Sequence, residues 1–132
     1  MPRPRVLCVD DQADNLQLRV AFLRRLGWKA VGVTDRRSAM RIAGRRRVDA
    51  CVLDYRLNNG DTGENVAQDL RAMRPEMPLI LLTGEICIPQ SARDSVDQVL
   101  IKGLNSTSEL ASTLTFLLAG IPCHETRAAR KG

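Results

Sequence analysis

Five side chains in this sequence lie at the ends of short apolar runs and could together carry phosphoryl chemistry. They are three carboxylates, a hydroxyl and an amine: Asp10, Asp11, Asp54, Thr83 and Lys102. Three carboxylates held close together repel one another unless a cation neutralises them, and hard oxygen ligands of this kind favour Mg²⁺. An ammonium group binds phosphate well. The residue types therefore predict a site that holds Mg²⁺ and a phosphoryl group.

The nucleophile for such chemistry must be a carboxylate. The single histidine, His124, lies near the C-terminus, and no serine is well placed, whereas a carboxylate can form an acyl phosphate. Phosphoryl transfer depends mainly on positioning and charge neutralisation, which a metal, an amine and a hydroxyl can supply. Simpler roles stay open: Asp11 as a helix cap, Thr83 as a strand end, Lys102 as a solvated cation and Asp54 as the start of a loop.

The apolar runs before these residues indicate buried strands. Unbroken runs, as in Cys51-Val-Leu, suit strands that are covered on both faces of a parallel sheet. We expect strands at 6–9, 28–34, 49–54, 78–83 and 98–102. Helices are expected at 13–26, 35–45, from 61 or 62 to before Pro75, and 106–119, with at most a short helix within 84–97.

The alternation of strands and helices predicts the fold. It indicates an α/β domain with a flavodoxin-like, doubly wound, five-stranded parallel sheet of order 2-1-3-4-5 and helices on both faces. In such sheets ligands bind outside the carboxyl ends of the strands, near the point where the strand order reverses. We therefore expect all five candidate side chains at one mouth, with the strand at 28–34 on an edge and outside the site.

Length and composition fit one globular domain. The chain has 132 residues, of which 44% are hydrophobic and 27% charged. We expect no contact with membranes and a cytoplasmic location, because no apolar run approaches the length of a membrane span and the first residues carry no signal-peptide core. The four cysteines are scattered and form no Cys-x-x-Cys pair, so free thiols are the favoured state. They are Cys8, Cys51, Cys87 and Cys123.

The net charge of +5 is concentrated on one predicted helix. Six arginines lie on or just after the helix at 35–45: Arg36, Arg37, Arg41, Arg45, Arg46 and Arg47. No aromatic residues lie between them and no nucleic-acid motif surrounds them. We therefore interpret this surface as a solvated helix face, expect no direct binding to nucleic acid, and leave its role open.

Four motifs carry a resemblance to a known family. Val9-Asp10-Asp11, Leu53-Asp54-Tyr55-Arg56-Leu57, Leu82-Thr83-Gly84 and Ile101-Lys102 occur in this order over about residues 5–119. Each motif is weak alone, but together they resemble the receiver domain of two-component response regulators, of the kind found in chemotaxis regulators. The resemblance implies a protein that catalyses only its own phosphorylation and dephosphorylation and is not otherwise an enzyme.

The resemblance also implies a role for each site residue. Asp54 would be the phosphoacceptor and carry the aspartyl phosphate, while Thr83 and Lys102 would hold the phosphoryl oxygens. Mg²⁺ would be bound directly by Asp11 and Asp54 and through water by Asp10. The backbone carbonyl of Arg56 would complete the protein ligands.

The implied partners are other proteins. The phosphoryl donor would be a phosphohistidine on a sensor histidine kinase or a histidine phosphotransfer protein. We expect a receiver domain at 1–120 and a short polar tail at 121–132, too short for an output domain, so the signal would pass to an unknown downstream protein. A homodimer through the face of the fourth helix, fifth strand and fifth helix is possible.

Several positions depart from the family pattern. Gly103 follows Lys102 where receivers usually have proline, Val99 replaces a frequent aromatic residue, and the fourth helix looks truncated around Pro89. These features lie on the output face. An alternative is therefore an interaction module with impaired switching, which would form an acyl phosphate without any change in partner affinity.

A haloacid-dehalogenase-type hydrolase is a further alternative that the sequence disfavours. That family needs a second aspartate two residues after the nucleophile, and Arg56 occupies this position. Arg56 and Glu85, each two residues past a strand-end site residue, should flank the mouth on neighbouring loops. We expect them either to pair across the entrance and restrict water, or to remain two solvated charges.

Overall fold

The computed structural model describes residues 3–103 and 106–119 of the protein. Along this part of the chain, five strands alternate with five α-helices, and one 3-10 helix (η1) follows the third strand. The strands are β1 (Arg5–Val9), β2 (Lys29–Val33), β3 (Ala50–Asp54), β4 (Leu79–Thr83) and β5 (Gln98–Ile101). The helices are α1 (Ala13–Arg25), α2 (Arg36–Arg45), η1 (Asn58–Gly60), α3 (Gly63–Met73), α4 (Gln90–Asp94) and α5 (Ser106–Leu118).

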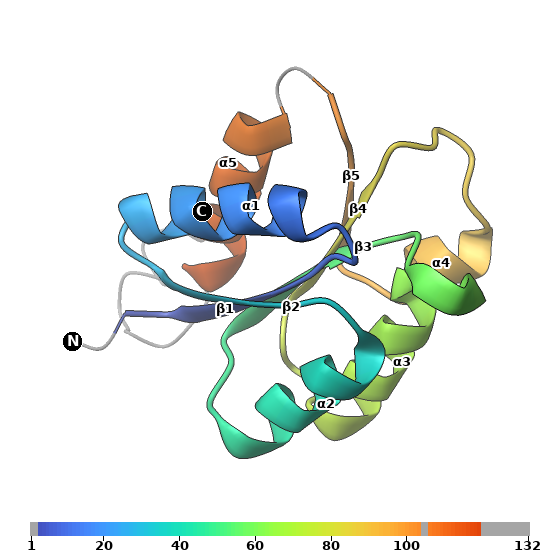
Figure 1. The fold of residues 1–132 in the computed structure, drawn as a ribbon, viewed down its shortest axis with the longest axis horizontal. Helices are drawn as coiled ribbons and strands as arrows, with labels where there is room; N and C mark the ends of the chain where they lie inside the picture. Colours follow the sequence, from blue (N-terminus) through green and yellow to red (C-terminus); the bar gives the residue numbers. More distant parts are fainter. Residues whose placement is uncertain (1–2, 104–105, 120–132) are drawn as a thin grey trace.

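The strands form one parallel sheet. Its order is β2-β1-β3-β4-β5, and every recorded pairing within it is parallel. The strand order reverses between β1 and β3, which is the place where an open α/β sheet binds its ligands. Figure 1 shows α1 and α5 on one side of the sheet and α2 and α3 on the other. The predicted flavodoxin-like fold is confirmed.

Each strand fills two hydrophobic cores, because successive side chains point to opposite faces of a sheet. Leu53 and Leu81 pack in the core that α2 and α3 cover. Val52 and Ile80 pack in the core that α1 and α5 cover. Residues of β3 and β4 are buried at every position, which explains why their sequences are unbroken apolar runs.

The predicted element bounds agree with the observed ones within a residue or two. The fourth helix is short, as expected, with only five residues at Gln90–Asp94. The 3-10 helix η1 was not predicted; it lies within a loop rich in turn-forming residues. The predicted tail at 121–132, with His124, lies outside the described residues.

Two of the cysteines lie in the cores. Cys8 and Cys51 are buried in β1 and β3, whereas Cys87 is exposed, and all three are free thiols. Burial raises the pKa of Cys8 to about 12. The two buried thiols therefore stay protonated and act as small hydrophobic side chains. Cys123 lies outside the described residues.

A glycine lets α3 begin directly against the end of β3. The Gly63 N–H donates a hydrogen bond to the Tyr55 carbonyl at 2.7 Å. A Cβ atom at position 63 would lie 2.5 Å from the Asp54 carbonyl oxygen and 2.7 Å from a Leu81 methyl group. Any larger residue would therefore push the backbone at Asp54 out of place. Gly63 therefore helps to position Asp54, a role that was not predicted from the sequence.

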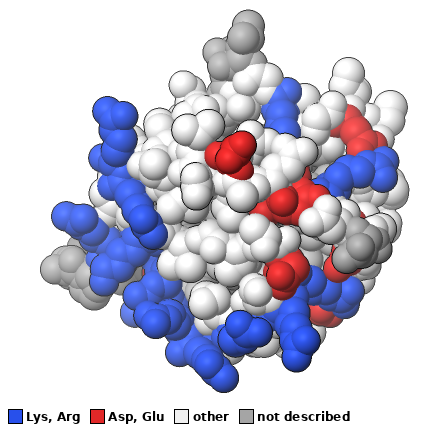
Figure 2. All heavy atoms as spheres, viewed as in Figure 1, with Lys and Arg blue, Asp and Glu red and all other residues white. Residues whose placement is uncertain are grey.

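Charged side chains are unevenly distributed over the surface. Figure 2 shows Lys and Arg along the left and lower edges of one face, and acidic side chains toward its right half. Arg37, Arg41 and Arg45 are exposed along α2, while Arg36 forms ion pairs with Asp61 and Asp69. Within the described residues, no helix has the length and apolar content needed to cross a membrane.

Candidate functional site

The carboxyl ends of four strands hold the candidate side chains in place. Backbone hydrogen bonds continue past the regular strands. The Asp10 N–H donates to the Val33 carbonyl at 3.1 Å, the Tyr55 N–H to the Leu82 carbonyl at 2.9 Å, and the Lys102 N–H to the Thr83 carbonyl at 2.8 Å. The sheet therefore fixes the backbone at or beside each site residue. Sites built on strands are held more rigidly than sites on free loops.

The three predicted carboxylates meet at one point. Asp10, Asp11 and Asp54 each offer one carboxylate oxygen, and these oxygens all lie within 4.8 Å of one another. Asp10 is fully buried, Asp54 is 6% exposed and Asp11 is partly exposed. This spacing and this all-oxygen donor set fit a hard divalent cation. The triad is therefore able to bind a metal, as the sequence predicted.

Lys102 pairs with the central carboxylate. Its Nζ lies 2.6 Å from Asp54 Oδ1, and the lysine side chain is about one-third exposed. Desolvation raises the pKa of Asp54, while the hydrogen bond and the charge of Lys102 lower it; the net effect is a pKa above the ordinary value. The carboxylate is therefore costly to keep ionised, and Lys102 is the cation that most directly offsets this cost.

Thr83 ends β4 beside this pair and is 2% exposed. Its Oγ1 accepts a hydrogen bond from the Glu85 N–H at 3.0 Å. A threonine hydroxyl has one proton to donate and can accept as well. Accepting from Glu85 therefore leaves the hydroxyl proton able to donate toward the pocket. The structure thus brings Asp10, Asp11, Asp54 and Lys102 together, and it places Thr83 at the carboxyl end of the neighbouring strand β4.

The site also contains an arginine that was not predicted from the sequence. Arg19, on α1, places Nη1 at 3.1 Å from Asp10 Oδ2, and its side chain is 12% exposed. The signal was present, since Arg19 lies three residues after Leu16 and four before Leu23, on the stripe that α1 buries. A cation on a buried stripe needs a buried partner, and Asp10 provides it.

The capping role considered for Asp11 is wrong. The residue before α1 is Gln12, which makes no side-chain capping bond. The neighbouring Asp10 Oδ1 accepts the hydrogen bond from the Gln12 N–H, at 2.9 Å. Asp11 accepts none of the hydrogen bonds recorded among the described residues, so its carboxylate faces the pocket without a competing local partner.

Arg56 and Glu85 pair across the mouth, as one of the two alternatives predicted. Both guanidinium contacts reach the Glu85 carboxylate, and the one from Nη2 measures 2.9 Å. The hydrogen bond from Arg56 lowers the pKa of Glu85. A backbone bridge between Arg56 and Thr62 fixes this loop next to Asp54. Metal ligation by the Arg56 carbonyl stays a prediction.

Comparison with known proteins identifies the family. The sequence profile of the response regulator receiver domain matches residues 6–113. The chain belongs to this family. The receiver domain is the phosphoacceptor of two-component signalling, and its acidic pocket here is formed by Asp10, Asp11 and Asp54. It is therefore not an enzyme that turns over a separate substrate.

Individual relatives agree with this assignment. The transcriptional regulatory protein PrrA of Mycobacterium tuberculosis is 36% identical over 116 residues, which cover 88% of this receiver and 46% of PrrA. This receiver thus spans about half the length of that relative. Transcription factor SKN7 of Saccharomyces cerevisiae is 35% identical over 81 residues, which cover 61% of this receiver and 13% of SKN7.

Solved structures share the fold. The chemotaxis protein CheY4 of Vibrio cholerae aligns with a TM-score of 0.79 and 25% identity, over 87% of this receiver and 98% of that chain. The response regulator TrrA of Thermotoga maritima, solved in complex with Mg²⁺-BeF, has the same TM-score at 23% identity and covers 86% of this receiver and 98% of that chain. The predicted receiver identity is confirmed.

Proposed function

We propose that this receiver accepts a phosphoryl group on Asp54, in a Mg²⁺-dependent reaction with a phosphohistidine on a sensor histidine kinase or a histidine phosphotransfer protein. The observation that carries the proposal is the position of Asp54. Its carboxylate lies within 4.8 Å of the two other carboxylates and 2.6 Å from the Lys102 ammonium. Such donors are made from ATP in the cytoplasm, where we place the protein.

The transfer needs an ionised acceptor and a neutralised phosphoryl group. A carboxylate oxygen of Asp54 attacks phosphorus, the phosphorus–nitrogen bond to the donor histidine breaks, and the imidazole nitrogen keeps the electron pair. Asp10, Asp11 and Asp54 would hold Mg²⁺, which when bound would supply charge neutralisation for the transfer. Lys102 holds a phosphoryl oxygen from the other side. The TrrA complex with Mg²⁺-BeF supports the choice of metal.

The conformational effect of phosphorylation would reach the surface through Thr83. The acyl phosphate carries close to two negative charges in place of the single charge of the carboxylate, and it brings strong acceptor oxygens. The hydroxyl of Thr83 can donate a hydrogen bond to one of the phosphoryl oxygens, and Thr83 would shift toward it. Because the Glu85 N–H donates to Thr83 Oγ1, this shift would also displace the loop that follows β4. We propose that the resulting loop state is what a downstream protein, or a second copy at the α4–β5–α5 face, recognises.

The direct test of this function is incubation with a small phosphodonor, with and without Mg²⁺, followed by intact-mass measurement. The expected result is the mass of one added phosphoryl group, dependent on Mg²⁺ and lost on hydroxylamine treatment, as an acyl phosphate requires. Unmodified protein under conditions that fully modify an unrelated receiver would refute the proposal.

The Arg56–Glu85 pair should slow loss of the phosphoryl group. Arg56→Ala removes both guanidinium contacts to Glu85 at the mouth, so water reaches the acyl phosphate more easily. Because solvent screens an exposed pair, we expect a modest effect, with dephosphorylation about two- to fivefold faster. The measurement is the decay of phosphorylated protein after the donor is removed.

A matched control exists at the opposite end of β3. Arg47 is exposed and pairs with Asp49 before the strand begins, so Arg47→Ala loses the same charge and an arginine–carboxylate contact far from the mouth. Its decay rate should equal that of the wild type. An unchanged rate in Arg56→Ala would show that the pair is no barrier to water.

A second candidate function is a receiver-like interaction module with impaired output. The observation that favours it is the five-residue α4, together with Val99 and Gly103 on the output face. Amide hydrogen exchange on the phosphorylated and unmodified protein separates the two functions. Altered protection in the α4–β5–α5 region supports a switching receiver, whereas identical protection supports the interaction module.

A further inference from the structure

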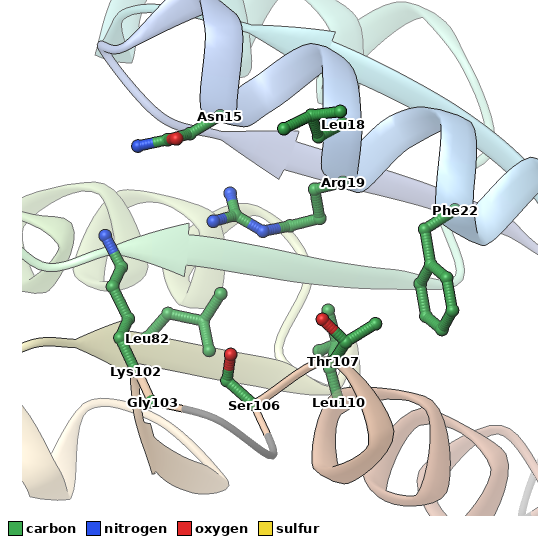
Figure 3. Close-up of a pocket in the computed structure, with 10 residues that line it drawn as sticks. All are labelled: Asn15, Leu18, Arg19, Phe22, Leu82, Lys102, Gly103, Ser106, Thr107 and Leu110. Atoms are coloured by element: carbon green, nitrogen blue, oxygen red, sulfur yellow. The ribbon is translucent and has the colours of Figure 1, made fainter.

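The acidic pocket contains a second cation that the proposed phosphoryl chemistry does not use. Arg19 reaches from the middle of α1 to Asp10, with a distance of 3.1 Å between Nη1 and Oδ2. Figure 3 shows a hollow between α1 and the start of α5, which is separate from the carboxylate cluster in its lining. The Arg19 guanidinium and the Lys102 ammonium point toward the same end of this hollow. Two cations from two elements therefore approach one carboxylate triad.

Burial makes the Arg19–Asp10 pair different from an ordinary surface ion pair. The Asp10 side chain has no exposed surface and that of Arg19 is 12% exposed. In a site with little water, charges interact strongly, and removing one partner leaves the other uncompensated. The other oxygen of Asp10 accepts from the Gln12 N–H. Both oxygens of Asp10 are thus already engaged within the protein.

The charges of the pocket are nearly balanced without a metal. Lys102 pairs with Asp54 and Arg19 pairs with Asp10, so two of the three carboxylates have a protein cation in contact. A divalent cation entering this pocket meets a fixed positive charge on the Asp10 side. Repulsion between like charges at short range in a partly dry site weakens binding.

We propose that Arg19 is a built-in countercation that stabilises the metal-free pocket and lowers its affinity for Mg²⁺. This inference rests on the proposed metal site. Arg19 acts through Asp10 and is therefore a positioning residue, which sets the Mg²⁺ concentration at which the receiver becomes competent for phosphorylation. In the metal-free receiver, it keeps Asp10 oriented and compensated.

The test compares Mg²⁺ affinity in the full chain by titration calorimetry. Arg19→Met keeps the length and apolar stem of the side chain but removes its charge, and we expect it to bind Mg²⁺ about tenfold more tightly or better. Arg19→Lys, which restores a cation, should bind much closer to the wild type. Arg25→Met removes the same charge from an exposed position at the end of α1 and should leave the affinity unchanged.

Thermal unfolding adds a second readout. In EDTA, Arg19→Met should melt at a lower temperature than the wild type, because Asp10 loses its buried partner. Mg²⁺ should raise the melting temperature of this variant more than that of the wild type, since tighter binding stabilises the folded state more. A purely structural arginine would lower the melting temperature without altering the Mg²⁺ affinity.

The outcomes separate this inference from the metal site itself. Equal or weaker Mg²⁺ binding by Arg19→Met, with normal binding by the wild type, overturns the role of Arg19 and leaves the metal site standing. Absence of Mg²⁺ binding in the wild type and in all three variants overturns the metal site and this inference together. If Arg19→Met does not fold, an NMR titration of the wild type with Mg²⁺ tests the proposal instead. The chemical shifts of the Arg19 guanidinium nitrogens should change as Mg²⁺ is added. Constant chemical shifts would contradict the proposal.

Discussion

Asp54→Asn protein should take up no phosphoryl group from a small phosphodonor that modifies the wild type. The amide keeps the size of the side chain but cannot attack phosphorus, and the neighbouring carboxylates do not replace it. Asp10 is engaged by Gln12 and Arg19, and Asp11 lacks the Lys102 contact that Asp54 has. The measurement is intact mass after incubation with donor and Mg²⁺. Phosphorylation of Asp54→Asn at the wild-type rate would show that another residue is the acceptor.

The same substitution should change stability in a pH-dependent manner. Burial raises the pKa of Asp54 above its ordinary value. A group with a raised pKa in the folded state contributes stability at acid pH that is lost as the pH rises through that pKa. Asparagine never ionises, so Asp54→Asn should be more stable than the wild type at neutral pH without Mg²⁺.

Urea unfolding over a series of pH values tests this expectation. The difference between Asp54→Asn and the wild type should shrink as the pH falls toward the ordinary range of an aspartate, because the wild-type carboxyl is then protonated as well. A constant difference at all pH values would contradict the raised pKa. Mg²⁺ at saturating concentration should reduce the difference at neutral pH, since only the wild type has the full triad.

Asp11→Ala should lose Mg²⁺ binding while keeping its fold. Asp11 is partly exposed and accepts none of the hydrogen bonds recorded among the described residues, so its removal leaves the packing intact. Loss of even an outer partner of a metal ligand costs about 10- to 100-fold in affinity. For a direct ligand we expect at least about a hundredfold loss, with phosphorylation slowed to a similar extent. Calorimetry and phosphorylation time courses measure the two effects.

A neighbouring acid provides the control for net charge. Asp14 lies exposed in the first turn of α1, and Asp14→Ala removes the same charge a short distance from the pocket. It should bind Mg²⁺ and accept the phosphoryl group as the wild type does. Wild-type Mg²⁺ affinity in Asp11→Ala would mean that the metal is held by the other two carboxylates alone.

The fold was predictable because its signals are local and repeated. The runs ending at Asp54 and Thr83 are apolar at every position, which only a strand covered on both faces requires. Gly27, with a φ of 100°, marks the end of α1 in sequence and structure alike. The chirality of parallel connections then leaves few topologies, and the predicted order follows.

The strand-end residues of the site were predictable for the same reason. Once the sheet order is known, side chains at the carboxyl ends of neighbouring strands must converge, and Asp10, Asp54 and Lys102 do so. The Arg56–Glu85 pair followed from equal offsets past two adjacent strands. In each case the backbone alone brings the residues close together.

Other features depend on side-chain detail that a sequence pattern does not contain. Whether Asp11 or Gln12 occupies the N-cap position of α1 depends on the backbone angles at a single residue. The N-cap expected at Asp11 therefore lies at Gln12 instead. The contact from Arg19 spans a long flexible side chain directed inward from α1. Gly63 is required by a close approach of α3 to β3 that becomes visible only in three dimensions.

The location of the phosphoryl group is the most direct test of this account. After incubation with phosphodonor and Mg²⁺, borohydride reduction converts an aspartyl phosphate to homoserine. Trypsin then releases two separate peptides: residues 48–56 contain Asp54, and residues 6–19 contain Asp10 and Asp11. We predict homoserine at position 54 alone. Homoserine at position 10 or 11, or at no aspartate of the pocket, would contradict the role assigned to the site.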